Sequence, residues 1–198
     1  ADSALGSRLL SSPEARILLM VGAGGLAPYL IAAHRAVRPS IDKVYVWNRD
    51  RAKAEKLAQA VKARVVDDLE EAAGQADIIS CATSTTVPVI KGAWLKSGAH
   101  LDLVGGFTPD MRECDDEAVR RARLFVDSRW FAIDQPGDLG DPLRRGVITR
   151  EDVEADLFDL CRDGYDVKRQ PDDITLFKNG GGAHLDLFTA LFIWRNLS

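Results

Sequence analysis

The chain has 198 residues and a net charge of −4 at pH 7. That length suffices for one well-packed domain or for one domain with parts of another, and the slight negative charge gives no reason to expect nucleic acid, whose binders usually carry a basic face. The longest apolar run, ILLMV, is far too short to span a membrane, and the first ten residues lack the three-part pattern of a signal peptide.

The cysteines and histidines do not form a recognisable site. Cys81, Cys114 and Cys161 are odd in number and widely spaced, which is typical of reduced thiols in a cytoplasmic protein. The three histidines are scattered without ligand spacing. We therefore predict no metal site and a cytoplasmic location.

From residue 16 onward, short apolar runs alternate with amphipathic stretches. This alternation predicts an α/β fold of the Rossmann type, a doubly wound and mostly parallel sheet flanked by helices. The predicted strands cover residues 16–21, 43–47, 76–82, 99–104, 123–127 and 174–178. We also predict a helix over residues 143–162, with Thr149 as a cap, and a last helix from Ala183.

A glycine-rich stretch, VGAGGLAPYL, follows the first predicted strand directly. Gly22, Gly24 and Ala27 match the dinucleotide fingerprint G-x-G-x-x-G/A, which needs a strand before it and a helix after it. Gly22 permits the tight turn, and Gly24 lets a pyrophosphate approach the backbone. The free N–H groups at the start of the helix would then bind the phosphates. The predicted cofactor-binding residues of this loop are Gly22, Ala23, Gly24, Gly25 and Leu26.

The second predicted strand ends in WNRD. A site for NAD usually has an acidic residue at this tip to hold the ribose hydroxyls. Here the tip carries Asn48 and Arg49, and a guanidinium suits the 2′-phosphate of NADP. We therefore predict NADPH as the cofactor, with NADH as the alternative. In the other interpretation, Asn48 or Asp50 only caps the next helix and Arg49 is solvated.

Both ends of the chain fit a Rossmann domain poorly. Residues 3–10 have the pattern of the end of a helix, and the last helix is apolar on nearly every face, so it needs a partner surface. The glycine run 180–182 before it is either a flexible link or a second anion-binding turn.

Taken together, these motifs resemble the ornithine cyclodeaminase/mu-crystallin family. The likeness runs nearly from end to end, through ADSALGSRLL, VGAGGLAPY, VYVWNRD, CATSTT, GGFTPDMRECDDE, PGDLGDPLRRGVI and DDITLFKNGGGAHLD. The resemblance implies a Rossmann domain, placed here at residues 13–181, and a second domain for substrate binding and dimerisation. Residues 1–12 and 182–198 would belong to that second domain, whose N-terminal part is expected outside this chain, together with the anchors for the substrate carboxylate.

The resemblance also implies further cofactor contacts. They are Cys81, Ala82 and Thr83 after one strand, Val104, Gly105 and Phe107 after the next, and Lys178 and Asn179 at the last strand. Gly181 and Asp186 match the family pattern as well, although Asp186 can be purely structural.

Phe107 occupies the position at which the cyclodeaminases and some alanine dehydrogenases of the family carry a catalytic aspartate. The Gly-Lys pair that follows in those enzymes is Asp110-Met111 here. Cyclodeamination needs a positioned acid and base, whereas a preformed cyclic imine needs mainly a hydride and orientation.

The resemblance therefore implies a homodimeric reductase of cyclic ketimine carboxylates, closest to the Δ1-pyrroline-2-carboxylate reductase branch, with no catalytic residue identified in this chain. The alternatives are an ornithine cyclodeaminase, an alanine dehydrogenase, and a non-catalytic binding protein such as mu-crystallin when it binds hormone.

Overall fold

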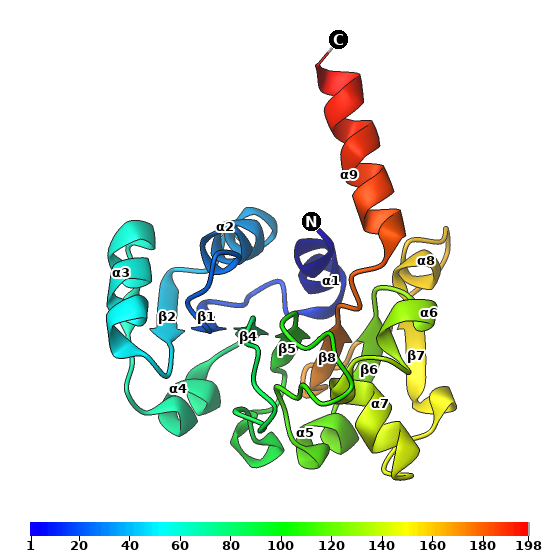
Figure 1. Ribbon diagram of the computed structural model, residues 1–198, viewed down its shortest axis with the longest axis horizontal. Helices are drawn as coiled ribbons and strands as arrows, with labels where there is room; N and C mark the ends of the chain where they lie inside the picture. The colour runs from blue at the N-terminus through cyan, green and yellow to red at the C-terminus, as the bar shows by residue number, and fades with distance from the viewer. Residues whose placement is uncertain (198) are drawn as a thin grey trace.

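A computed structural model describes residues 1–197 and shows one parallel sheet of eight strands (Figure 1). The strand order is β3-β2-β1-β4-β5-β8-β6-β7, and every strand pair is parallel, so the predicted doubly wound α/β fold is confirmed. The strands are β1 (Ile17–Val21), β2 (Lys43–Trp47), β3 (Arg64–Val65), β4 (Ile78–Cys81), β5 (His100–Leu103), β6 (Arg123–Val126), β7 (Val153–Asp156) and β8 (Thr175–Lys178).

Helices cover both faces of this sheet because its strands are apolar on both sides. In β1, Leu18 and Met20 pack under one layer of helices, whereas Leu19 and Val21 pack under the other. The first layer holds α1 (Asp2–Leu10), α2 (Ala27–Val37) and α3 (Arg51–Val61) (Figure 1). The second holds α4 (Leu69–Gln75), η1 (Gly92–Trp94), α5 (Asp116–Arg121) and α7 (Gly137–Arg144). No helix within residues 1–197 is long and apolar enough to cross a membrane.

The helix predicted over residues 143–162 is wrong. The chain instead forms the end of α7, a 3₁₀ turn η2 (Arg150–Asp152), strand β7 and a short helix α8 (Leu157–Leu160). Thr149 does cap, but it caps only η2, where Thr149 and Asp152 form a reciprocal capping box. Val153 and Ala155 then alternate with exposed residues and pair with β6. Two apolar residues in an acidic stretch are too few to reveal a strand by period.

The first helix, α1, is joined to α2 by an arginine at the end of α2. Arg38 donates from Nη2 to the carbonyl oxygens of Ser7, Arg8 and Ser11, at 3.0, 2.7 and 2.9 Å. These acceptors lie in the last turn of α1 and at the residue that follows it, where helix carbonyls lack partners farther along the helix. Leu10 is fully buried in one apolar cluster with Phe125 and Phe177, so α1 is part of the packed core on this side.

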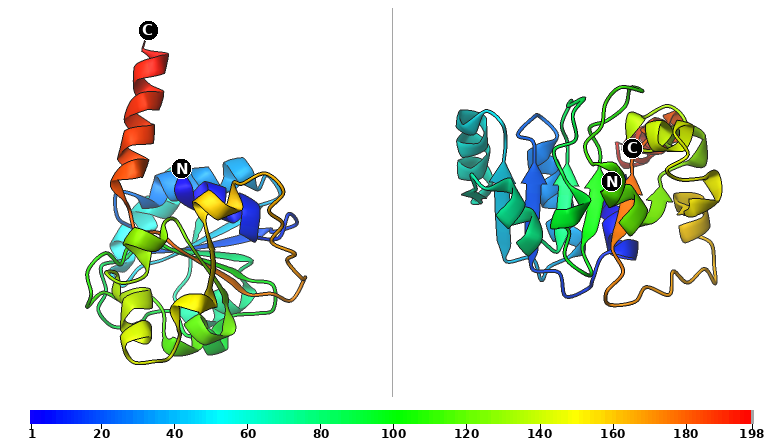
Figure 2. Two further views of the ribbon diagram at one scale, coloured as in Figure 1. Left: turned by 90° about the vertical axis from the view of Figure 1, so that its right-hand side faces the viewer. Right: turned by 90° about the horizontal axis from the view of Figure 1, so that it is seen from below.

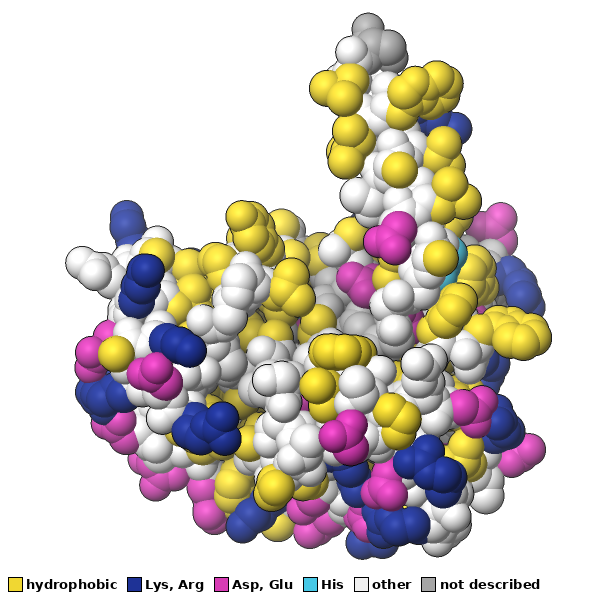
Figure 3. Space-filling model, viewed as in Figure 1, with side chains coloured by type: hydrophobic (Ala, Val, Ile, Leu, Met, Phe, Trp, Pro, Cys, Tyr) yellow, Lys and Arg dark blue, Asp and Glu magenta, His cyan; other side chains and the backbone are white. Residues whose placement is uncertain are grey.

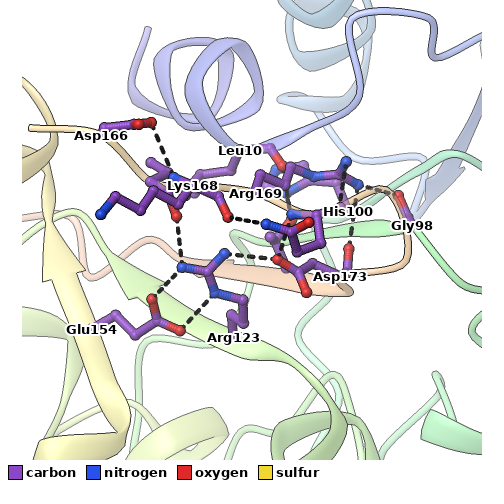
Figure 4. Close-up of polar contacts among 12 residues, drawn as sticks. Leu10, Gly98, His100, Arg123, Glu154, Asp166, Lys168, Arg169 and Asp173 are labelled. Carbon is purple, nitrogen blue, oxygen red and sulfur yellow. Dashed lines mark hydrogen bonds and ion pairs between the residues drawn. The ribbon is translucent and has the colours of Figure 1, made fainter.

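A polar cluster ties together the amino-terminal ends of the strands on one side of the sheet (Figure 4). Arg123, at the start of β6, forms a two-pronged pair with Glu154 of β7, at 2.8 and 2.6 Å, and also binds Asp173 at 2.8 Å. Arg169 donates to the carbonyl oxygen of Gly98, just before β5, at 2.7 Å. The glycine-rich loop, in contrast, follows the carboxyl end of β1, so these contacts lie at the opposite ends of the strands from it.

The last helix, α9 (Ala183–Asn196), projects away from the domain (Figure 2) and confirms the predicted apolar helix. None of its described residues is buried, and apolar side chains run along its length (Figure 3). Its base is fixed by His184, whose ring lies against Phe131 and Phe158 at centroid distances of 5.8 and 5.5 Å. The short helix α6 (Arg129–Ala132) supplies Phe131. The division of the chain into domains at residues 12 and 182 stays a prediction.

Candidate functional site

A cleft of about 440 Å³ opens where the order of strands reverses, at the carboxyl ends of β1 and β4. In doubly wound folds this crevice is where ligands bind. Here β1 pairs with β2 on one side and β4 on the other, with Leu19 level with Tyr45 and Ile79. The cleft is lined by Gly22, Ala23, Gly24, Gly25, Trp47, Asn48, Arg49, Asp50, Lys53, Ala82, Thr83, Ser84, Thr85 and Val89.

The glycine-rich loop forms the floor of this cleft, and its two key glycines differ in what surrounds them. Gly22 has a φ of +106°, and a Cβ there would lie 2.5 Å from the carbonyl oxygen of Ala82, so the turn itself requires glycine. Gly24 has no atom within 4 Å of the position a Cβ would take. The fold therefore does not require glycine at position 24, where the absence of a side chain leaves open space beside the backbone.

The loop presents unpaired donors at the start of α2. The N–H groups of Gly24, Gly25 and Leu26 donate no hydrogen bond within residues 1–197. Pro28, in the first turn, has no N–H to lose. Free N–H groups at the positive end of a helix dipole bind anions. This part of the cleft therefore fits a phosphate or pyrophosphate group.

The tip of β2 forms one wall of the cleft. The Asn48 side chain accepts a hydrogen bond from the N–H of Ala23 at 3.1 Å and donates to the carbonyl oxygen of Asp50 at 2.9 Å. Asp50 caps α3 by accepting from the N–H of Ala52. Asn48 and Asp50 thus both make hydrogen bonds that stabilise the local structure. Arg49, in contrast, is exposed and lines the cleft together with Lys53.

The residues predicted after β4 and β5 lie side by side. The N–H of Val104 donates to the carbonyl oxygen of Cys81 at 2.8 Å. A side chain on Gly105 would collide with the backbone of Thr83. Ala82 and Thr83 line the cleft, but Cys81 is fully buried. Burial raises the pKa of the Cys81 thiol well above its usual value, so this thiol is inert.

Leu26 and Phe107 are exposed and are not among the residues that line the cleft. Leu26 begins the first turn of α2, and Phe107 is at the turn after Gly105 and Gly106. The Phe107 side chain is 62% exposed. A phenyl ring exposed to this degree is an apolar surface that a ligand can cover.

Lys178 and Asn179, predicted to contact the cofactor, are both buried. The Asn179 amide donates to Asp102 at 2.9 Å and to Ser3 of α1 at 3.2 Å. Lys178 is fully buried and its Nζ lies 3.0 Å from Asp138. The structure therefore does not bring their side chains to the wall of the cleft, and a direct cofactor contact by either residue stays a prediction.

Two acidic residues near the site, Glu113 and Asp138, were not predicted from the sequence. Glu113 and Asp138 are fully buried, and Asp138 pairs with Lys178. Burial, together with the negative charge of Asp138, raises the pKa of Glu113 to about 7. An acid and a lysine spaced 40 residues apart in GDLG and LFKN show no sequence motif, and only the fold brings them together.

The sheet order and the glycine-lined cleft define a protein of the Rossmann class. The sequence model of the ornithine cyclodeaminase/mu-crystallin family matches residues 1–198, and the chain belongs to that family.

Several known relatives share this family. A protein named Δ1-pyrroline-2-carboxylate reductase from Paracoccus denitrificans is 48% identical over 98% of this chain and 63% of its own length. The mouse protein named ketimine reductase mu-crystallin is 35% identical, over 100% of this chain and 61% of its own. The structure of Thermococcus litoralis Δ1-pyrroline-2-carboxylate reductase, in complex with NADH and L-proline, aligns with a TM-score of 0.89 at 31% identity, covering 95% of this chain and 60% of that one. The chain thus spans about three fifths of the length of the relatives it matches.

Proposed function

We propose that this protein is an NADPH-dependent reductase of cyclic ketimine carboxylates, such as Δ1-pyrroline-2-carboxylate and Δ1-piperideine-2-carboxylate. The observation that carries the proposal is Phe107, an exposed phenyl ring at the turn where the cyclodeaminases of the family have a catalytic acid. The names of the relatives from Paracoccus denitrificans and Thermococcus litoralis support the same substrate class.

Asp110, the one acidic residue in the sequence 105–111, is a poor proton donor. It accepts a hydrogen bond from the Thr108 hydroxyl, and this bond holds the pKa of Asp110 below its usual value. Asp110 is therefore ionised at neutral pH. A cyclic ketimine can take its proton from water near neutral pH, so its reduction does not need an acid at this turn, whereas expulsion of ammonia from ornithine does.

The cleft has the features that a nicotinamide dinucleotide needs. The free N–H groups of Gly24, Gly25 and Leu26 would hold the pyrophosphate, and Ala82, Thr83, Val104 and Gly105 would line the path toward the nicotinamide. When bound, the cofactor supplies the hydride. Phe107 would then cover the ring region and exclude water, which favours hydride transfer over side reactions.

The test of the function is a rate comparison on the full-length protein. NADPH oxidation is measured with the two cyclic imines and with pyruvate plus ammonia, and ammonia release is measured with ornithine. We expect turnover with the cyclic imines and none with ornithine. Ammonia release from ornithine at a matching rate would overturn the proposal, and turnover with pyruvate plus ammonia alone would favour an alanine dehydrogenase.

The preference for NADPH rests on Arg49, and we expect Arg49→Ala to weaken NADPH binding by about 1–3 kcal/mol, as for a lost charged hydrogen bond. NADH binding should stay nearly unchanged, because NADH has no 2′-phosphate. The measurement is calorimetric titration of both cofactors. Arg51→Ala is the matched control, since Arg51 is also exposed at the start of α3 but is paired with Glu55 and Asp67 outside the cleft. Equal losses of both cofactors in Arg49→Ala would show that Arg49 does not recognise the 2′-phosphate.

We also propose that the functional protein is a homodimer and that a substrate and dimerisation domain covers α9. The support is the exposure of Phe188, Phe192 and Trp194, whose side chains are more than half accessible on a helix with no buried residue. An apolar surface of this kind marks an interaction site.

A further inference from the structure

One buried carboxylate, that of Glu113, connects the two loops that end β4 and β5. Its Oε1 accepts hydrogen bonds from the N–H and the hydroxyl of Thr83, at 2.7 and 2.8 Å. Its Oε2 accepts from the N–H of Gly105 at 2.8 Å. Thr83 lines the cleft, and Gly105 leads into the Phe107 turn. A single side chain therefore sets the spacing between these two loops.

Glu113 is itself held by the buried pair beneath it. Asp138 accepts from the N–H of Glu113 at 2.6 Å through Oδ1, and its Oδ2 lies 3.0 Å from the Nζ of Lys178. A Cβ on Gly106 would collide with the carboxylate of Asp138. The turn 105–111, which carries Phe107, thus packs directly against this cluster. The cluster therefore determines the position of the turn relative to the sheet.

We infer that Glu113 is a positioning residue for the nicotinamide half of the cofactor, a role that rests on the proposed function. It does not touch the ligand. It orders the Thr83 and Gly105 backbones that would line the nicotinamide end, whereas the adenosine half would lie at the tip of β2, among residues that Glu113 does not contact.

A glutamine in place of Glu113 cannot reproduce this connection. Both carboxylate oxygens face backbone N–H donors, so either orientation of the amide places its NH₂ group against an N–H. One link between the loops is therefore lost although the side chain keeps its size. The strand pairing through Val104 and Cys81 does not involve Glu113 and should keep the sheet intact.

The charge of Glu113 allows the same positioning role to be tested by changing the pH. The ionisable groups around it are Asp138 on α7, Lys178 at the end of β8, Cys81 at the end of β4 and its neighbour Cys114. Burial raises the pKa of both thiols, so they stay neutral. The pKa of Glu113 is raised to about 7. Because only the ionised form accepts at both oxygens, binding of the nicotinamide half should strengthen as the pH rises through this value.

The experiment compares NADPH with adenosine 2′,5′-bisphosphate, which lacks the nicotinamide half, by calorimetry on wild type and Glu113→Gln. We expect NADPH affinity to fall about tenfold or more, with the affinity for the bisphosphate within about twofold. Between pH 6 and 8 the ratio of the NADPH affinity to the bisphosphate affinity should rise in wild type relative to the same ratio in Glu113→Gln. Titration of the 2′-phosphate cancels in this ratio because both ligands carry it, and titration of the 5′-phosphate, which is a monoester only in the bisphosphate, affects wild type and Glu113→Gln alike. Glu117→Gln, an exposed acid on α5, is the control.

A second variant, Thr83→Val, keeps the test decisive if Glu113→Gln folds poorly. It removes only the hydroxyl bond to Glu113 and should lower NADPH affinity severalfold while sparing the bisphosphate. Equal loss of both ligands, or loss of neither, in the folded variants overturns the positioning role. If wild type binds neither ligand, the cofactor proposal itself fails and this inference fails with it.

Discussion

Replacement of Lys178 by methionine is expected to lower the free energy of unfolding by about 3–5 kcal/mol, the usual cost of breaking a buried ion pair by removing one partner. Lys178 and Asp138 are both fully buried with their charged atoms 3.0 Å apart. Without the ammonium group, the carboxylate of Asp138 would be left without a cation, close to the second buried acid, Glu113. The measurement is urea unfolding at pH 7.

The double variant Lys178→Met/Asp138→Asn separates the effect of charge from the effect of size. Asparagine keeps an oxygen that can accept from the N–H of Glu113, so the double variant should recover part of the lost stability. Lys96→Met is the control, because its partner Asp77 is partly exposed, and it should cost about 1 kcal/mol or less. A loss below about 1 kcal/mol in Lys178→Met would show that the buried pair contributes little.

Replacement of the two fingerprint glycines should have different effects: loss of NADPH affinity at Gly24 and loss of stability at Gly22. We expect Gly24→Val to keep its stability within about 0.5 kcal/mol, because no atom lies near its Cβ position. Its affinity for NADPH should nevertheless fall about a hundredfold or more, since the side chain would occupy the space that the pyrophosphate needs. Urea unfolding and calorimetric titration give the two quantities.

Gly22→Ala should instead destabilise the fold by about 1–3 kcal/mol, the cost of a strained backbone position. At Gly22 the φ of +106° and the nearby Ala82 carbonyl both oppose a side chain. Gly24→Val that binds NADPH like wild type would contradict the assignment of this loop as the phosphate site. Gly22→Ala with unchanged stability would contradict the packing described for the turn.

Much of the fold could be predicted because its signals are local. The strand ILLMV and the glycines after it lie within ten residues of each other, and that is the range over which apolar runs and turn residues act. The same holds for Asn48 and Arg49 at the tip of β2. Strand β7 was missed because only Val153 and Ala155 show the alternation, and their burial depends on pairing with β6, nearly thirty residues away.

The buried cluster of charged residues beside the site could not be predicted for a related reason. Glu113, Asp138 and Lys178 come from three separate segments, and each looks like an ordinary charged residue on its own. Their burial follows from the sheet order, which places β8 between β5 and β6. The family resemblance did point to Lys178, but it did not indicate that the ammonium group turns toward Asp138 inside the protein.

The fastening of α1 by Arg38 has a consequence for how the domain opens. A helix of nine residues is short enough to fray, and its amides would then exchange with solvent far faster than those of the core. Here carbonyls in its last turn accept hydrogen bonds from Arg38, at the end of α2, and Leu10 is buried in one apolar cluster with Phe125 and Phe177. We therefore expect the helix and the sheet to open as one cooperative unit, with the amides near Leu10 exchanging only when that unit opens.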